Sequence, residues 1–198
     1  MQDTIAIAVL AGGQGRRMGG QDKALLQLSG QPLLGHLLGR LQPQANQIVL
    51  SANGDPARFS AFGLPVVADD IADAGPLAGI LAAAAYCQTK WPQTQRLITI
   101  PVDTPFPPPD LVQRLTLAPD SGVGVAQAGG RLHWAVACWP MAAARRLTAA
   151  VHNAGLRRLE TAIRAEGFTA VPFACANAFA NINTPDDLKD LSALLTPP

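Results

Sequence analysis

The feature that most constrains the fold of this chain is a glycine-rich basic segment between two apolar runs, VLAGGQGRRMGGQDKALL (Val9 to Leu26). The run TIAIAVL (Thr4 to Leu10) is short, contains β-branched residues and is apolar on both sides, as is typical of a central parallel strand covered by helices on both faces. After the segment, Pro32 can begin a helix, and leucines then recur at helical spacing up to Leu41. The segment is therefore predicted to be the loop of a strand–loop–helix unit.

The same alternation continues through the first half of the chain. QIVLSA (Gln47 to Ala52), PVVA (Pro65 to Ala68) and RLITI (Arg96 to Ile100) are predicted to be strands. GPLAGILAAAAYC (Gly75 to Cys87) is predicted to be an alanine-rich helix whose small side chains allow close packing on a sheet. Alternating elements of these lengths indicate an open α/β sheet with right-handed crossovers.

Beyond Asp120 the pattern changes. GVGVAQAGGRLHWAVACW predicts two strands about the turn at Gly129 and Gly130. Three helices are expected, over 141–150, over 155–166, and from Pro185, where Thr184 supplies a capping hydroxyl. We therefore expect one domain over residues 1–198, built on an open, mostly parallel twisted sheet with helices on both faces and a mixed or antiparallel edge in the C-terminal half.

Composition excludes several classes of protein. The charged fraction of 15% and the hydrophobic fraction of 48% are typical of a folded globular enzyme, and the net charge of +1 gives no global basic field for binding nucleic acid. No apolar run reaches the roughly 18 residues of a membrane span, and the N-terminal run lacks the basic flank of a signal peptide. Three cysteines without CxxC spacing suggest neither a disulfide framework nor a zinc site, which fits a reducing cytoplasm.

The glycine-rich segment has the chemistry of a phosphate site. Successive backbone N–H groups in such a turn form a concave site for anionic oxygens, at the sheet edge where open α/β proteins bind ligands. Neither the GxGxxG nor the GxxxxGK[ST] pattern fits. What remains is a longer basic loop in which Arg16, Arg17 and Lys23 can neutralise a triphosphate. The alternative is a surface turn with solvated basic residues.

Carboxylates and amides follow other predicted strands. Asp69, Asp70 and Asp103 should face the same crevice, and oxygen-only ligands favour Mg²⁺, although each could instead be a turn residue. Asn53 could present its amide to a nucleobase or ribose, or simply occupy a left-handed turn. Asn181 and Asn183 in FANINTP could hold a polar heterocycle, whereas a lone histidine such as His133 is more often structural.

These motifs together resemble a known family. LAGGQGRRMGGQDKALLQLSGQPLLGHLLGRL resembles the LAGGxxxRMGxDKALL opening of molybdenum cofactor guanylyltransferases, the MobA family, and DDIADAGPLAGI, PVDTPFPPPDL and FANINTPDDL resemble its later motifs in the same order. The resemblance implies transfer of GMP from Mg·GTP to the terminal phosphate of molybdopterin, with release of pyrophosphate. It also implies a GTP-binding N-terminal half, a molybdopterin-binding C-terminal half, and molybdoenzymes, their chaperones or other cofactor-biosynthesis proteins as partners.

The resemblance also implies roles for individual residues. Leu10, Ala11, Gly12 and Gly13 would contact the guanine nucleotide. Arg17 and Lys23 would bind its phosphates and act with Asp103 in catalysis. Asn53 and Asp69 would lie at the base or ribose end, and Asp103 would hold Mg²⁺. Asn181 and Asn183 would lie toward the molybdopterin.

Some positions depart from the family pattern, and other activities stay open. Trp134 stands where the family usually has proline, Leu156 replaces a commonly polar residue, and residues 88–95 resemble an extended surface loop. The sister cytidylyltransferase shares the fold, but Gly13 and Thr104 favour guanine. Sugar-phosphate nucleotidyltransferases share the opening loop but usually run longer. A non-catalytic carrier of the cofactor would bind GTP without consuming it.

Overall fold

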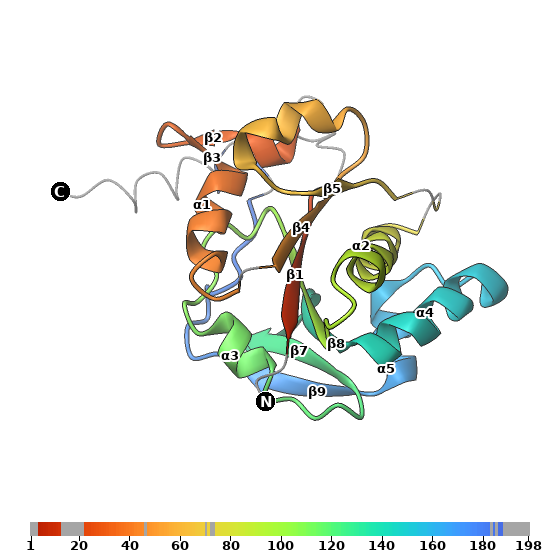
Figure 1. Cartoon of the computed structure of the whole chain (residues 1–198). Coiled ribbons are helices and arrows are strands. Elements are labelled where there is room, and N and C mark those ends of the chain that lie inside the picture. The colour runs from red at the N-terminus through yellow and green to blue at the C-terminus, as the bar shows by residue number, and fades with distance from the viewer. Residues whose placement is uncertain are drawn as a thin grey trace.

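A seven-stranded sheet in the order β5-β4-β1-β6-β8-β7-β9 forms the centre of the fold (Figure 1). The computed structural model describes residues 4–12, 22–45, 47–69, 71, 74–182, 184 and 186–187. The strands are β1 (Ile5–Leu10), β4 (Gln47–Ser51), β5 (Val66–Val67), β6 (Arg96–Pro101), β7 (Val123–Ala128), β8 (Arg131–Pro140) and β9 (Phe168–Pro172). A separate small hairpin consists of β2 (Gln27–Leu28) and β3 (Gln31–Pro32).

All strands of the large sheet run parallel except β8. Strand β8 pairs antiparallel with both β6 and β7, and it forms with β7 the predicted hairpin about Gly129 and Gly130. The mixed C-terminal half is thus confirmed. The antiparallel strand lies inside the sheet, because β9 pairs parallel with β7 and occupies the edge.

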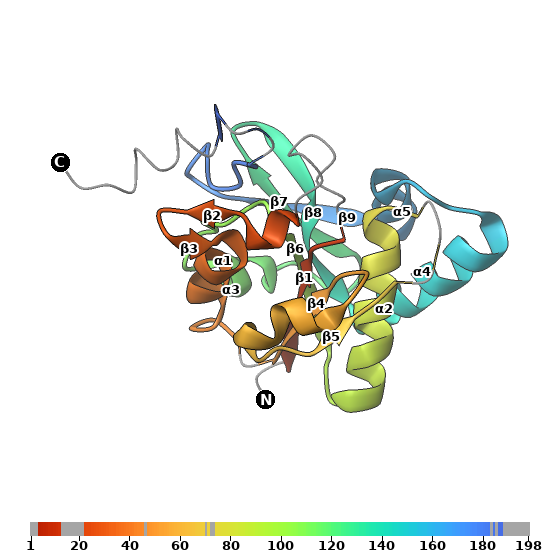
Figure 2. The same cartoon turned by 90° about the horizontal axis from the view of Figure 1, so that it is seen from above.

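The sheet is covered by helices on both faces, as expected. Helices α1 (Leu33–Leu41) and α3 (Leu111–Leu115) lie on one face, and α2 (Pro76–Lys90), α4 (Met141–Ala154) and α5 (Leu159–Glu166) lie on the other; Figure 2 shows the strands between these two groups. Strand β1 alternates between the two cores. Ile7 and Val9 pack with α1 and α3, whereas Ala6 and Ala8 pack with α2. Two apolar faces explain why β1 is hydrophobic throughout.

Three helix ends differ from the expectation, and one of them is the end of α4, which lies at Ala154 and not at residue 150. Residues 88–90, predicted to begin a surface loop, continue α2, where the hydroxyl of Thr89 bonds to the carbonyl of Ala85 and Lys90 lies in the last turn. Helix α5 begins at Leu159 and not at Gly155, because Gly155 takes the left-handed conformation (φ +64°) that ends α4. Sequence patterns predict the centres of helices better than their ends.

The start of the last predicted helix is only partly described. Among its described residues, the amide of Asp187 donates to Oγ1 of Thr184 (3.1 Å), and the amide of Thr184 donates to Oδ2 of Asp187 (2.9 Å). This reciprocal pair confirms the predicted capping hydroxyl. Within the described part of the chain, no helix is both long and apolar enough to cross a membrane.

Candidate active site

The candidate site lies where the parallel strands β1, β4, β5 and β6 end at one edge of the sheet. Backbone hydrogen bonds continue past the strands there. The amide of Ala11 donates to the carbonyl of Ser51 (2.8 Å), and the amide of Val102 donates to the carbonyl of Leu10 (3.0 Å). The segments that leave neighbouring strands are therefore held side by side at this edge, where open α/β sheets bind ligands.

The glycine-rich segment begins at this edge of the sheet. Leu10 is the last residue of β1 and Ala11 follows it, and a Cβ atom built at Gly12 would lie 3.5 Å from Oδ2 of Asp69. The backbone of Gly12 therefore runs directly past the carboxylate of Asp69. Gly13, Arg16 and Arg17 lie outside the described residues, so their roles stay predictions.

Lys23 and Asp103 are brought together at this edge of the sheet. Lys23 begins the short 3-10 helix η2 (Lys23–Leu25), and Asp103 follows the end of β6. Nζ of Lys23 lies 2.8 Å from Oδ2 of Asp103, and only 14% and 19% of the two side chains are exposed. The residues predicted to bind phosphate and metal thus form one partly buried ion pair.

The other oxygen of Asp103 suits a cation ligand. Oδ1 is buried and has no hydrogen-bond partner in the structure as described. No group of three or more His, Cys, Asp or Glu side chains that could hold a metal occurs among the described residues. A single carboxylate with one unpartnered oxygen fits Mg²⁺, which commonly takes one or two protein carboxylates and completes its octahedron with phosphate oxygens and water.

Asn53 and Asp69, from the ends of β4 and β5, form a second pair. The side-chain amide of Asn53 donates to Oδ1 of Asp69 (3.1 Å), and its oxygen accepts from the backbone amide of Asp69 (2.9 Å). The two residues predicted for the base or ribose end therefore meet. Asp70 lies outside the described residues.

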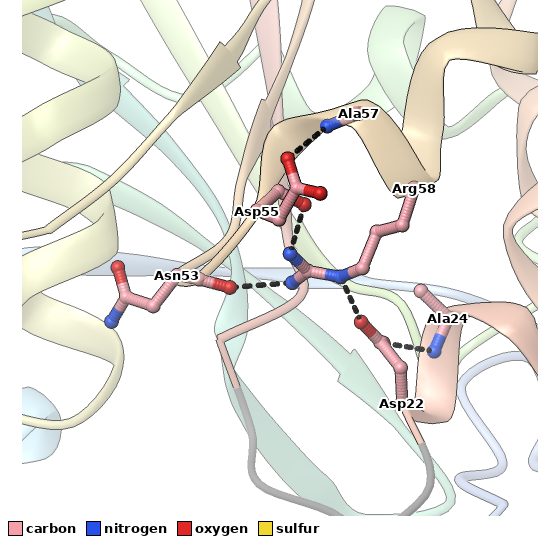
Figure 3. A network of polar contacts seen from close by, with 6 residues as sticks. All are labelled: Asp22, Ala24, Asn53, Asp55, Ala57 and Arg58. Atoms are coloured by element: carbon pink, nitrogen blue, oxygen red, sulfur yellow. Dashed lines mark hydrogen bonds and ion pairs between the residues drawn. The ribbon is translucent and has the colours of Figure 1, made fainter.

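An arginine that the sequence interpretation missed joins Asp22, the residue before Lys23, to the backbone of Asn53 (Figure 3). Arg58 lies on the 3-10 helix η3 (Pro56–Phe62), and its Nε donates to Oδ2 of Asp22 (2.7 Å), the residue before Lys23. Its terminal nitrogens donate to the carbonyls of Asn53 and Asp55. The available signal was Asp55-Pro56, a capping residue followed by a helix-starting proline, which places Arg58 one turn later.

The predicted amide from the C-terminal segment reaches the same edge of the sheet. Oδ1 of Asn181 accepts from the hydroxyl of Thr104 (3.0 Å), and the amide of Ile182 donates to the carbonyl of Asp103 (2.9 Å). Asn181 is therefore held beside the segment that carries Asp103. Asn183 lies outside the described residues.

His133 and Trp134 have different surroundings. The His133 ring lies 5.0 Å from the Phe179 ring, and its Nε2 is buried without a partner among the described residues. Burial lowers the pKa of His133, so the neutral imidazole is favoured. Trp134 instead packs against Phe168 and the guanidinium of Arg164. Like Leu156, it is partly buried and packs against the core on the α5 side of the sheet.

Comparisons with known proteins show a family. Residues 7–166 match the model of the MobA-like NTP transferase domain. The chain is 46% identical over 187 residues to the molybdenum cofactor guanylyltransferase of Cereibacter sphaeroides, covering 94% of this chain and 95% of the relative. It is 43% identical over 204 residues to the protein of the same name from Mesorhizobium japonicum, covering 98% of both chains.

A solved structure shows the same fold. The molybdopterin-guanine dinucleotide biosynthesis protein A of Archaeoglobus fulgidus superposes with a TM-score of 0.70 at 24% identity, over 96% of this chain and 97% of the other. A sequence identity this low supports the fold alone. The solved structure therefore supports the fold described above.

Proposed function

The chain belongs to the MobA-like NTP transferase family, and on that premise we propose that it transfers GMP from GTP to the terminal phosphate of molybdopterin or Mo-molybdopterin. The products are pyrophosphate and the guanine dinucleotide form of the cofactor. The names of the relatives from Cereibacter sphaeroides and Mesorhizobium japonicum support this choice of substrates.

The observation that carries the proposal is the ion pair between Lys23 and Asp103. It places one cation and one carboxylate beside the start of the glycine-rich segment, with one carboxylate oxygen still unpartnered. A nucleoside triphosphate bound with Mg²⁺ offers complementary groups to both side chains: anionic oxygens for the ammonium and a cation for the carboxylate. The pair is therefore suited to a metal–triphosphate substrate.

The other residues at the ends of the strands would bind the remaining parts of the two substrates. Asn53 and Asp69 would contact the base or ribose, with their amide and carboxylate held in one orientation by their mutual hydrogen bonds. Gly12 would let the nucleotide approach the backbone beside Asp69. Asn181, fixed by Thr104, would face the acceptor. Arg17, Gly13 and Asn183 are proposed to act in the same regions on the basis of the motif alone.

Mg²⁺ is the proposed metal, and Asp103 would hold it through Oδ1. When bound, Mg²⁺ would neutralise negative charge on the triphosphate and on the pyrophosphate leaving group. Lys23 would bind non-bridging phosphate oxygens, whose charge rises in the transition state. Positioning and charge stabilisation account for most catalysis of this type, so few reacting side chains are needed.

The chemical step requires no side-chain nucleophile. An oxygen of the acceptor's terminal phosphate attacks the α-phosphorus of GTP in line, a new P–O bond forms, and the bond between the α-phosphorus and the bridging oxygen to the β-phosphorus breaks. The electron pair of that bond leaves with pyrophosphate. The attacking phosphate is already ionised at neutral pH, so no general base is required.

The setting of the reaction is also proposed. The three cysteines Cys87, Cys138 and Cys175 are few and far apart in the sequence and lack CxxC spacing, which supports action in the reducing cytoplasm. Molybdoenzymes, their chaperones or other proteins of cofactor biosynthesis would receive the product.

The test is pyrophosphate release from each of the four nucleoside triphosphates with Mg²⁺, with and without molybdopterin or Mo-molybdopterin. Release with GTP only, and only with the pterin, is expected. A preference for CTP would assign the sister cytidylyl transfer. Tight GTP binding without pyrophosphate release would indicate a carrier and contradict the proposal.

A further inference from the structure

We infer that Arg58 is a positioning residue that holds the phosphate side and the base side of the nucleotide site at a fixed separation. This inference rests on the proposed function, because it concerns the same nucleotide. Arg58 belongs to neither predicted set of ligands. It contacts the residue before Lys23 and the backbone of Asn53, and so lies between the two groups.

All three guanidinium nitrogens of Arg58 are engaged (Figure 3). Nε donates to the Asp22 carboxylate, Nη1 donates to the carbonyl of Asp55, and Nη2 donates to the carbonyl of Asn53. Asp22 lies on one segment, and Asn53 and Asp55 lie on another. Arg58 and Asp22 are 36 residues apart in the sequence. A planar fork with fixed donor directions can join such acceptors, and an ammonium group cannot reproduce all three directions.

Asp22 transmits the contact to Lys23. One carboxylate oxygen accepts from Arg58, and the other accepts from the backbone amide of Ala24 (3.1 Å), which caps the helix η2. Lys23 is the first residue of that helix. The contact from Arg58 thus orients the turn from which the Lys23 side chain reaches Asp103.

Asn53 carries the contact to the base side. Its carbonyl faces Arg58 while its side chain points away from the guanidinium in Figure 3. That side chain makes both hydrogen bonds to Asp69. The hydrogen bond from Arg58 to the carbonyl of Asn53 therefore leaves both hydrogen bonds between Asn53 and Asp69 intact, and it fixes the position of Asn53.

The surroundings of Arg58 hold the guanidinium in place. Its Cζ lies 4.3 Å from the centre of the Phe59 ring, and Phe59 is buried. Gly54 has φ +86°, and a Cβ atom there would lie 3.2 Å from Nη1. The backbone turn after β4 therefore passes closely around the guanidinium. About a quarter of the Arg58 and Asp22 side chains is exposed (26% and 22%), so solvent only partly screens their attraction.

A fixed distance between the phosphate side and the base side of the site has a measurable effect on the affinity for GTP. A ligand that bridges two prealigned subsites gains from the high effective concentration of its second half, whereas the separate halves gain nothing. Loss of Arg58 should therefore weaken binding of intact GTP more than binding of guanosine or pyrophosphate. Loss of a residue that merely stabilises the fold would weaken the binding of GTP, guanosine and pyrophosphate to the same extent.

The experiment measures dissociation constants of GTP, guanosine and pyrophosphate with Mg²⁺, by competition against a fluorescent GTP analogue, on the full chain. The variants are Arg58→Gln, Arg58→Lys and Asp22→Asn, and the control is Arg146→Gln. Arg146 forms an ion pair of equal length (2.7 Å) with Glu166 on α4 and α5, away from the site. Asp22→Asn retains an oxygen to cap η2, so it also tests the contact if Arg58→Gln does not fold.

We expect Arg58→Gln and Arg58→Lys to weaken GTP binding by about tenfold, with Asp22→Asn following in the same direction, while guanosine and pyrophosphate change by less than about threefold. The control should change none of the three. Equal losses for GTP and its fragments, or full rescue by lysine, would overturn the inference. If the wild-type protein prefers another nucleotide, the proposed function fails, and the same comparison with that nucleotide and its nucleoside still tests Arg58.

Discussion

Nζ of Lys23 lies 2.8 Å from Oδ2 of Asp103, so the proposed phosphate ligand and the proposed metal ligand neutralise each other. A cation that binds Asp103 without nucleotide must approach a carboxylate already paired with an ammonium group. Nucleotide phosphates offer Lys23 a new partner, so nucleotide and metal should assist each other's binding, by the same factor in both directions.

Lys23→Met should therefore increase the affinity for metal alone. Mn²⁺, a paramagnetic substitute for Mg²⁺, should bind the variant without nucleotide about tenfold more tightly, because removal of a charge 2.8 Å away is worth on the order of 1 kcal/mol or more. GTP should bind more weakly. Electron paramagnetic resonance titration measures the free Mn²⁺. Lys90→Met, which removes an exposed cation at the end of α2, is the control, and an unchanged Mn²⁺ affinity in Lys23→Met would contradict the pairing argument.

Asp103→Asn should lower turnover with Mg²⁺ and GTP by about 10² or more, since lost charge stabilisation at a phosphoryl centre costs this much. The variant keeps the shape of the side chain and an oxygen that can accept from Lys23, so it should stay folded. Steady-state pyrophosphate release gives the rate, and circular dichroism checks the fold. Near-normal turnover would remove Asp103 from the metal site.

Asn53→Ala should raise the KM for GTP by roughly ten- to a hundredfold and change kcat little, because it removes binding at a distance from the reacting phosphorus. The loss also releases Asp69 from the only side chain that the described structure pairs with it. Steady-state kinetics at varied GTP separates the two constants. A fall in kcat with unchanged KM would place Asn53 at the chemical step instead.

The positions of these residues were predictable, but their pairings were not. Asp103, Asn53 and Asp69 each follow a strand, and parallel strands end at one edge, so a shared crevice follows from the pattern of strands. The partner of each side chain depends on which strands are neighbours. Lys23 and Asp103 are 80 residues apart and meet because β1 lies beside β6, which periodicity along one strand does not encode.

The elements that the sequence interpretation missed are short or lie at edges. Strand β9 has only one residue of five that is buried, Val171, and it ends in proline, so neither alternation nor a continuous apolar run marks it. Helix α3 has five residues, too few for a helical period to repeat. Arg58 follows the turn sequence NGDP, and only the three-dimensional course of that turn brings its guanidinium to Asp22.

The close approach of α2 to the site edge of the sheet gives a stability prediction. A Cβ atom at Gly79 would lie 2.6 Å from Oγ of Ser51 and 3.3 Å from Cδ2 of Leu10. Gly79→Ala should therefore destabilise the fold by about 1–3 kcal/mol through overpacking. Gly39, on the exposed side of α1, has open space around such an atom, so Gly39→Ala should stabilise by about 0.5–1 kcal/mol. Urea unfolding measures both, and equal effects would contradict the packing argument.

The buried imidazole of His133 predicts a dependence of stability on pH. Desolvation by burial lowers its pKa below the ordinary 6.5, with the nearby charge of Arg131 acting in the same direction and a backbone hydrogen bond at Ala128 opposing it. Above the ordinary pKa both folded and unfolded chains hold a neutral imidazole, so His133 leaves the free energy of unfolding unchanged there. As the pH falls below 6.5, the unfolded chain takes up the proton first, and stability decreases until the folded imidazole is also protonated.

His133→Gln removes this titration and keeps an uncharged polar side chain. The free energy of unfolding of the variant should therefore fall less between pH 7.5 and pH 5 than that of the wild-type chain, although the variant is expected to be no more stable than wild type at pH 7.5. Urea unfolding at a series of pH values gives both curves, and carboxylates that titrate at lower pH contribute equally to each. Parallel curves across pH 6.5 to 5 would show that the imidazole exchanges its proton as readily in the folded chain as in the unfolded one, which the unpartnered, buried Nε2 beside Phe179 argues against.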